Sequence, residues 1–396
     1  MDSIKTTNNF VFQTYQRHPK TFVKGKGVFL FDENNNKYID FLSGISVCNL
    51  GHCNSQITKA IVKQSKKLVH VSNLFYTKPQ AKLAKILCKK SFADKVFFAN
   101  SGAEANEAAI KLARRYFQKK NEERFKIISM KQSFHGRTMA SLSATGQDKI
   151  KNGFSPLLKG FAYAPFNDFN ALKKQIDKTV CAIMLEPIQG EGGVIPATRK
   201  YLKKIRALCD KKGILLIFDE VQCGMGRCGS LFAHQMYGVT PDIMTIAKAL
   251  GNGLPIGAML ATNEASSGFD FGSHATTFGG TPLVAAAALE VIKIISKESF
   301  LHQVYTKGLY FKEKLSNLKE KHPQILALRG KGLLLGLELQ SDASFFVNEL
   351  MKKGFITNAI QDNVLRLSPP LIISKAHINK FISALDRILR NQNGVK

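Results

Sequence analysis

The chain has 396 residues, a length that predicts two domains rather than one. Hydrophobic residues make up 44% of it, which is ordinary for a globular protein. Its 57 basic and 29 acidic residues give a formal charge of +28, yet the lysines stand in ones and twos, without a zinc-finger, helix-turn-helix or RNP signature. The composition therefore favours a solvated, lysine-rich surface over a nucleic-acid or membrane protein, and no apolar run is long enough to span a membrane.

The cysteines predict reduced thiols. They are Cys48, Cys53, Cys88, Cys181, Cys209, Cys223 and Cys228. An odd number, scattered through a long chain without a nearby histidine pair, argues against a disulfide framework and against zinc. Because residues 1–10 contain no charged lead followed by an apolar core, we expect no signal peptide and a cytoplasmic location.

The first three quarters of the chain predict an N-terminal arm followed by alternating strands and helices. Residues 28–31 and 37–41 predict strands that flank a turn at 32–36. Residues 54–87 predict mainly helix, with a loop around 73–79. The elements that follow are strands 95–99, 126–130, 180–185, 214–218 and 243–246, and helices 101–117 and 201–211. This alternation predicts an α/β architecture with a mostly parallel sheet flanked by helices.

The last quarter has a different pattern. After a predicted helix at 282–296 come a helix, strands near 326–339, another helix and strands near 355–367, which predict a smaller α+β domain. The predicted organisation is an N-terminal arm at 1–50 that contributes to the small domain, a large α/β domain at 51–299 and a small C-terminal domain at 300–396.

Two loops that follow predicted strands carry groups suited to anions and planar rings. Ser101 and Gly102 stand where a helix begins, and free backbone N–H groups there favour a phosphate, with an ordinary Ser N-cap as the alternative. Phe134 can stack on a planar ring and Arg137 offers a fork for a carboxylate; the alternative is a core phenylalanine and a surface arginine. His135 lacks a Ser or Cys nucleophile nearby, so we interpret it as structural.

Three later stretches carry candidate binding groups. Glu191 lies among three glycines in 186–193, so its carboxylate can pair with an arginine for one substrate and release it for another, or the loop can be a plain turn. Arg366 stands inside a predicted strand, where a lone cation needs a partner such as Glu191 or a substrate carboxylate. The hydroxyls of 273–280 suit a phosphate, although such loops are usually only loops.

The central pattern lies in residues 213–257. The apolar run 214–218 ends in Asp219, and a second apolar run ends in Lys248. Buried parallel strands place the residues at their carboxyl ends in the ligand crevice of the sheet. A lysine followed by the uncharged run 249–258 is poorly placed for solvation, and a desolvated lysine loses its charge readily. Pyridoxal phosphate needs such a pair, an amine that forms a Schiff base with its aldehyde and a buried carboxylate that keeps its pyridinium nitrogen protonated.

Two polar residues accompany this pair. Gln222, three residues after Asp219, is placed to donate to the cofactor's ring oxygen. Asp242, which follows Pro241, is interpreted as an N-cap or turn residue.

Together these segments resemble the class III (subgroup II) aminotransferases, which are fold-type-I enzymes dependent on pyridoxal 5′-phosphate. The resemblance runs from about Tyr15 to the end, and its pieces, in order, are SGAEANE, FHGRT, EPIQGEGG, FDEVQCGMGR, IAKALGNGLPIGA, HATTFGG and LRLSPP. It implies a large PLP-binding α/β domain with a smaller α+β C-terminal domain, and a homodimer whose active sites lie at the subunit interface.

The resemblance also implies roles toward the cofactor. Lys248 would form the Schiff base and move the proton between substrate and cofactor, and Asp219 would hold the pyridinium proton. The ring would be contacted by Phe134 and Gln222. The phosphate would be held by Ser101, Gly102 and Ala103, joined by Thr277 from the partner subunit.

Toward substrates, the resemblance implies that two arginines bind the carboxylates of different substrates. Arg366 would bind the α-carboxylate of glutamate or 2-oxoglutarate, with Glu191 as the switch that masks it. Arg137 would bind the α-carboxylate of an ω-amino substrate, and Thr276 would contact that substrate. Ile45 stands where ornithine aminotransferases tend to carry a tyrosine, and its apolar side chain suits an uncharged N-acyl group better than a free ammonium.

Within the family, the segments SFHGRT and FDEVQCGMGR are most similar to the acetylornithine aminotransferases of bacterial arginine synthesis. This implies transfer of the terminal amino group of N2-acetyl-L-ornithine to 2-oxoglutarate, with N-succinyl-LL-2,6-diaminopimelate, from lysine synthesis, as a second donor. It implies no metal, nucleic acid or membrane partner. The alternatives are an ornithine, succinylornithine or 4-aminobutyrate aminotransferase, an aminomutase, or, in another class, a catalytically inactive basic binding protein.

Overall fold

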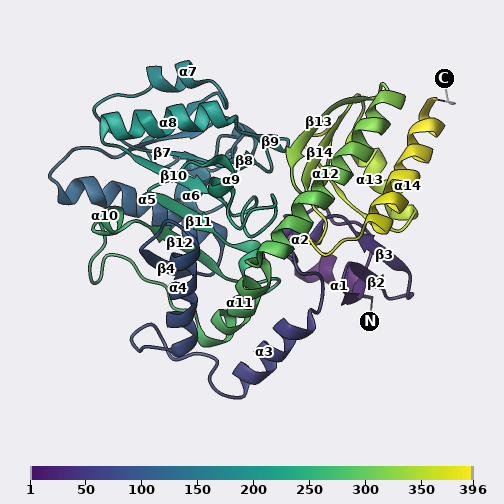
Figure 1. The fold of residues 1–396 in the computed structure, drawn as a ribbon, viewed down its shortest axis with the longest axis horizontal. Coiled ribbons are helices and arrows are strands. Elements are labelled where there is room, and N and C mark those ends of the chain that lie inside the picture. Colours follow the sequence, from purple (N-terminus) through teal and green to yellow (C-terminus); the bar gives the residue numbers. More distant parts are fainter. Residues whose placement is uncertain (1, 394–396) are drawn as a thin grey trace.

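The computed structural model describes residues 2–393, and Figure 1 shows a larger body containing the central sheet beside a smaller body at the C-terminal end. The larger sheet has seven strands in the order β4-β12-β11-β10-β7-β5-β6. Their bounds are β4 Lys95–Ala99, β5 Lys126–Met130, β6 Phe161–Ala164, β7 Val180–Leu185, β10 Leu215–Asp219, β11 Ile243–Ile246 and β12 Gly257–Ala261. Only β12 runs antiparallel to its neighbours, so the prediction of a mostly parallel sheet is confirmed.

The central strand β10 shows why this sheet is buried on both faces. Leu215 and Ile217 pack into the core under α5, whereas Leu216 and Phe218 pack into the core under α8. Side chains alternate between the faces of a strand, so a continuous apolar run fills both cores. The helices around this sheet are α3 Ser55–Ser65, α4 Lys78–Lys90, α5 Gly102–Lys119, α6 Met139–Ala144, α7 Phe169–Lys174, α8 Arg199–Lys212, α9 Ala233–Tyr237, α10 Asn263–Ser266 and α11 Pro282–Ile295.

The smaller body is built on an antiparallel sheet in the order β13-β14-β17-β16. Its strands are β13 Ile325–Lys331, β14 Leu334–Leu339, β16 Asn358–Ile360 and β17 Val364–Leu367. Its helices are α12 Glu298–Lys321, α13 Ala343–Lys352 and α14 Lys375–Asn393. The predicted order of helices and strands from residue 282 to 367 is confirmed, whereas the C-terminal helix α14 was not predicted.

The N-terminal strands join this smaller body. A second sheet contains β1 Phe22–Lys26, β2 Phe29–Asp32, β3 Lys37–Asp40 and, parallel to β3, the C-terminal strand β15 Phe355–Ile356. Phe41 follows β3 and stacks on Phe381 of α14 with ring centroids 4.3 Å apart. These contacts support the predicted division of the chain at about residues 50 and 300, which stays a prediction.

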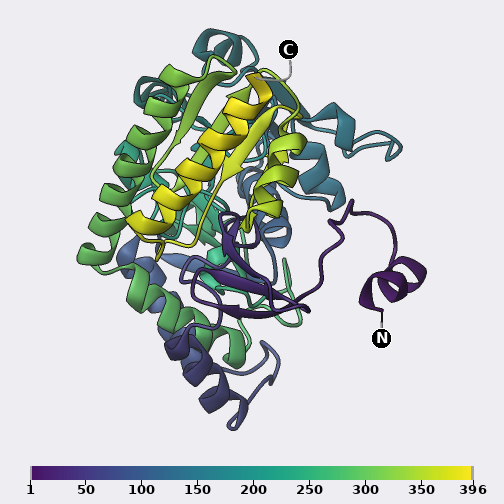
Figure 2. The same cartoon turned by 90° about the vertical axis from the view of Figure 1, so that its right-hand side faces the viewer.

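Shorter elements complete the chain. They are α1 Ser3–Phe10, α2 Ser43–Ser46, the 3-10 helices Asp148–Ile150 (η1) and Lys248–Leu250 (η2), and the two-stranded sheet of β8 Ile188–Gln189 and β9 Ile195–Pro196. Figure 2 shows α1 standing apart from the rest of the chain, and none of its residues is buried. Across residues 2–393, we find no helix with the length and apolarity needed to cross a bilayer.

Candidate active site

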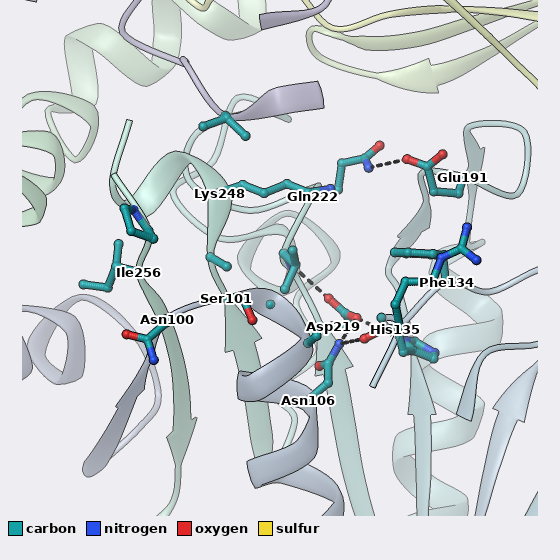
Figure 3. A pocket seen from close by; sticks show the side chains of 18 of the residues that line it. Asn100, Ser101, Asn106, Phe134, His135, Glu191, Asp219, Gln222, Lys248 and Ile256 are labelled. Atoms are coloured by element: carbon teal, nitrogen blue, oxygen red, sulfur yellow. Dashed lines mark hydrogen bonds and ion pairs between the residues drawn. The ribbon is translucent and has the colours of Figure 1, made fainter. Parts of the chain in front are cut away.

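A cavity of about 450 Å³ opens where β10 and β11 end and α5 begins (Figure 3). Its size is typical of small-molecule sites. The predicted site residues that line it are Ser101, Gly102, Ala103, Phe134, Arg137, Glu191, Asp219, Gln222 and Lys248. Residues far apart in sequence therefore meet at the carboxyl edge of the sheet, as expected for an open α/β fold.

Asp219, the last residue of β10, is buried and held by several donors. Its Oδ2 accepts a hydrogen bond from Asn106 Nδ2 at 2.7 Å and lies 2.8 Å from Nδ1 of His135. Its Oδ1 accepts the backbone N–H of Val221 at 3.0 Å. Asn106 is itself oriented by the hydroxyl of Thr245 on the neighbouring strand β11, which donates to its Oδ1 at 2.7 Å. The carboxylate is therefore fixed in orientation before any ligand arrives.

Lys248 begins η2, just after β11, with a left-handed φ of 45°. Such a backbone conformation is costly for a residue with a side chain and is often found at functional sites. Burial lowers the pKa of Lys248 below its usual value, although the charge of Glu191 opposes the shift. Among residues 2–393 its amine has no hydrogen-bond partner. A lysine with a lowered pKa and an unpaired amine at a cavity is suited to nucleophilic chemistry.

The first turn of α5 forms another wall of the cavity. The hydroxyl of Ser101, the N-cap, accepts the N–H of Glu104 at 3.2 Å. Gly102 has no room for a side chain, because a Cβ there would lie 2.8 Å from Val221. The unpaired N–H groups and the dipole at the start of this helix favour an anion.

Arg366 lies on β17 in the smaller body and is 1% exposed. Its Nη1 forms an ion pair with Glu191, and Gln222 bridges them by donating to Glu191 at 3.2 Å and accepting from Arg366 at 3.3 Å. Burial alone would raise the pKa of Glu191, but the charges of Arg366 and Lys248 outweigh it, so this pKa is lowered. Nη2 of Arg366 is buried and has no partner among the described residues, so the guanidinium can still take a carboxylate.

Not every predicted residue lies in this cavity. Within one chain, Thr276 and Thr277 line a separate cavity of about 790 Å³, and only Thr276 approaches the first one, by accepting from Asn100 Nδ2 at 3.2 Å. Ile45 is partly exposed and does not line the first cavity, whereas its neighbour Val47 does.

Asp242 lies at a bend directly before β11, which fits a turn residue rather than an N-cap, and its side chain makes two further contacts. Its Oδ2 accepts the N–H of Leu216 at 2.7 Å and pairs with Arg206 at 2.8 Å. It therefore links β10 to α8, and it satisfies a backbone N–H near the start of the buried central strand β10.

Sequence reasoning missed three residues of the site. The sequence patterns give no role to Asn106 or Glu186 and favour a structural His135, whereas in the structure all three line the cavity and both Asn106 and His135 contact Asp219. Two signals were available. Asn106 stands four residues after Gly102, on the same face of α5, and Glu186 directly follows β7.

These residues fit pyridoxal phosphate in chemistry and in shape. An amine, a fixed carboxylate, an aromatic ring and a helix N-terminus all face one cavity of suitable volume. The lack of space for a Cβ at Gly102 keeps the helix start close to the cavity wall at Val221.

Comparison with known proteins gives consistent results. The family model described as Aminotransferase class-III matches residues 12–389. An acetylornithine aminotransferase from Methanocaldococcus jannaschii is 50% identical over 386 residues, covering 97% of both chains. One from Caldanaerobacter subterraneus is 50% identical over 96% of this chain and 97% of its own.

Solved structures show the same fold. The ornithine aminotransferase of Toxoplasma gondii superposes with a TM-score of 0.95 at 31% identity, covering 99% of this chain and 95% of its own. The N-acetylornithine aminotransferase of Stenotrophomonas maltophilia superposes with a TM-score of 0.85 at 34% identity, covering 99% and 100%.

Proposed function

Because the chain belongs to the class-III aminotransferases, a family that depends on pyridoxal phosphate, we propose that it transfers the terminal amino group of N2-acetyl-L-ornithine to 2-oxoglutarate. The products are N-acetyl-L-glutamate 5-semialdehyde and L-glutamate. The supporting observation is the cavity lined by Lys248, Asp219 and Glu191, the last of which pairs with Arg366 just outside the lining. The substrate assignment is supported by the acetylornithine aminotransferases that match nearly the full chain.

We assign the cofactor contacts from the geometry above. The aldehyde would link to Lys248, the ring would lie against Phe134 with its nitrogen at Asp219, and its phosphate would meet Ser101, Gly102 and Ala103. When bound, the cofactor withdraws electrons from the substrate carbon that bears the amine. The amine of Lys248 would move the proton at that carbon.

The two arginines would separate the two half-reactions. With the amino donor bound, Glu191 masks Arg366, and Arg137 holds the donor's α-carboxylate so that the far amine reaches the cavity. With 2-oxoglutarate bound, Glu191 moves away and Arg366 takes the α-carboxylate by a bidentate contact. Glu191 is suited to this exchange because it lies on a loop with glycines on both sides.

The homodimer is part of the same proposal. The loops before α4 and before α11 pack together, since Asn73 Nδ2 donates to the carbonyl oxygens of Thr276 and Gly279 at 3.1 Å. Together they expose large apolar side chains, which we call the apolar loop surface: Leu74, Phe75, Tyr76, Phe271 and Phe278. An exposed patch of this kind marks an interaction site. A second copy seated there would bring its Thr277 toward the phosphate end of the neighbouring cavity.

The experiment that tests the substrate is a comparison of amino donors. With 2-oxoglutarate as acceptor, we expect kcat/KM to be highest for N2-acetylornithine among ornithine, N-succinylornithine, 4-aminobutyrate and N-succinyl-LL-2,6-diaminopimelate. Ornithine is the main competitor because of the structural likeness to ornithine aminotransferases. A higher kcat/KM for ornithine would reject the acetyl preference, and no turnover of any donor by cofactor-loaded protein would reject the transaminase assignment.

A further inference from the structure

Glu186 is a buried acid at the cavity to which nothing above gives a role. It directly follows β7, is 5% exposed and lines the cavity. Its Oε2 accepts the backbone N–H of Phe134 at 3.1 Å, and its Oε1 accepts the backbone N–H of Gly190 at 3.1 Å. Among residues 2–393, these two N–H groups are its only hydrogen-bond partners. One carboxylate therefore joins the loop of Phe134 to the loop of Glu191.

The loop that carries Glu191 connects β8 to β9 and is held on both sides of that residue. Gly190 is tightly packed, because a Cβ there would lie 2.1 Å from Gln222 Oε1. Beyond Glu191, Gly193 and Val194 have left-handed φ values of 107° and 54°. The hydrogen bond from Gly190 to Glu186 holds the residue directly before Glu191, and Gln361 Nε2 donates to the carbonyl oxygen of Glu191 itself at 3.0 Å.

We propose that Glu186 is a positioning residue that couples the aromatic wall at Phe134 to the mask on Arg366. It acts by holding both loops, so that Glu191 returns to Arg366 only when Phe134 is in place against the cavity. This inference rests on the proposed function, because it concerns how one cavity serves two half-reactions. Burial is the main reason that the pKa of Glu186 is raised to about 7, with His135 lowering it and Asp219 raising it.

The first test replaces Glu186 by glutamine. In Glu186→Gln one oxygen remains to accept an N–H, but the amide nitrogen faces the other N–H and cannot accept it. Glu191 then covers Arg366 less often, and an uncovered Arg366 competes for the carboxylate of the acetylated donor. We expect kcat/KM of the acetylornithine half-reaction to fall about tenfold more than that of the glutamate half-reaction.

A second readout does not depend on turnover. The visible circular dichroism of the bound cofactor reports how an aromatic side chain is held beside it, so Glu186→Gln should weaken this signal at equal cofactor loading. The pH dependence of this signal near neutrality should also flatten, since Glu186 is the group with a pKa of about 7 that contacts the Phe134 loop, and glutamine does not titrate.

Glu220→Gln is the matched control. Glu220 is also buried, accepts the backbone N–H groups of Ala233 and His234, and has a pKa raised to about 7 mainly by burial. It caps α9 and does not line the cavity. Glu220→Gln therefore buries an amide in place of a carboxyl, as Glu186→Gln does, but it leaves the connection between the Phe134 and Glu191 loops intact. We expect similar losses of melting temperature in both variants, with the half-reaction ratio and the dichroism changed only in Glu186→Gln.

Equal changes in both variants, or an unchanged ratio in Glu186→Gln, would overturn the proposal. If Glu186→Gln does not fold, Glu186→Asp provides the measurement, because its shorter side chain keeps the charge but reaches only one of the two N–H groups. The ratio should shift in the same direction, and an unchanged ratio would again overturn the proposal. Failure of the proposed function would be seen separately, as wild-type protein that transaminates neither substrate.

Discussion

Two buried charges at the cavity are compensated in different ways. Asp219 is surrounded by donors from Asn106, Val221 and His135, and its orientation is fixed. Arg366 donates to Asn358 and Gln222, but its only charged partner among the described residues is Glu191, and one of its buried nitrogens has no partner there. A buried charge is costly unless it is paired. Arg366 therefore favours a second carboxylate whenever Glu191 withdraws, which is the basis of the predicted division between the arginines.

Replacing each arginine separately tests this division. We expect Arg137→Ala to raise KM for acetylornithine and Arg366→Ala to raise KM for 2-oxoglutarate, each by roughly 10- to 100-fold, because a hydrogen bond to a charged group is worth about 1.5–3 kcal/mol. Steady-state kinetics with one substrate varied at a time measures both values. Equal effects of the two substitutions on both substrates would reject the division of labour.

At the residue scale, the sequence predicted those site residues that directly follow or end an apolar strand. Asp219 and Lys248 follow apolar runs that predict buried strands, and such strand ends meet in one crevice. Asn106, His135 and Glu186 were missed because their roles depend on contacts with residues distant in the sequence. The pairing of Asn106 with Asp219 spans 113 positions, which no local pattern records.

At the scale of elements, two strands of the central sheet were not predicted. β12 begins at Gly257, where a Cβ would lie 2.2 Å from the carbonyl oxygen of Ser101. Its glycine-rich start gives no strand signal in the sequence, although it reflects close packing of a strand against the start of α5. β6 is a four-residue strand at the sheet edge, too short to give a clear alternation. The strands with longer apolar runs were predicted within one or two residues of their observed bounds.

His52 connects the loop after α2 to β3, and its charge should control stability at high pH. Its Nε2 lies 2.8 Å from Asp40 Oδ2, and hydrogen bonds to Asp40 and Cys48 raise its pKa to about 10. The folded state therefore holds a proton that the unfolded state releases near pH 6.5. The stabilisation is complete below pH 6.5 and is lost as the pH rises to about 10, with an upper bound of about 5 kcal/mol. We expect His52→Gln to flatten this decline in melting temperature.

His234 provides the opposite case for comparison. Burial lowers its pKa to about 4, so its contribution is complete above pH 6.5 and is lost as the pH falls toward 4, with a limit of about 3 kcal/mol. His234→Gln should therefore flatten only the acid side of the profile. Melting temperatures at pH 4 to 10 for both variants measure the two windows, and the same change on both sides in either variant would contradict the assignments.

At the scale of the whole molecule, the two bodies are joined by a fully buried cation. Nη1 of Arg227 donates to the carbonyl oxygens of Leu333 at 3.1 Å and Pro369 at 2.5 Å, and its Nη2 donates to Ser43 at 3.3 Å and to Asn49. Three segments of the chain thus meet at one guanidinium. The parallel pairing of β3 with β15 also joins the N-terminal arm to the C-terminal part, through backbone hydrogen bonds. Sequence periodicity predicted these elements but not their pairing, because strands about 300 positions apart share no local signal.

The apolar loop surface gives the last prediction. Leu74 and Tyr76 are almost completely exposed, and Thr277, expected at a partner's phosphate site, lies outside the cavity of its own chain. If a second copy covers this surface, cofactor-loaded protein should sediment as a dimer, with an interface of at least about 1,600 Å². Leu74→Asp would bury an unpaired charge there, so it should shift the protein to monomers and lower turnover with the monomer fraction. Leu309→Asp, an exposed leucine on α12, is the matched control and should remain a dimer with full activity. An active wild-type monomer, or a Leu74→Asp dimer as stable as the control, would show that the cavity is complete within one chain.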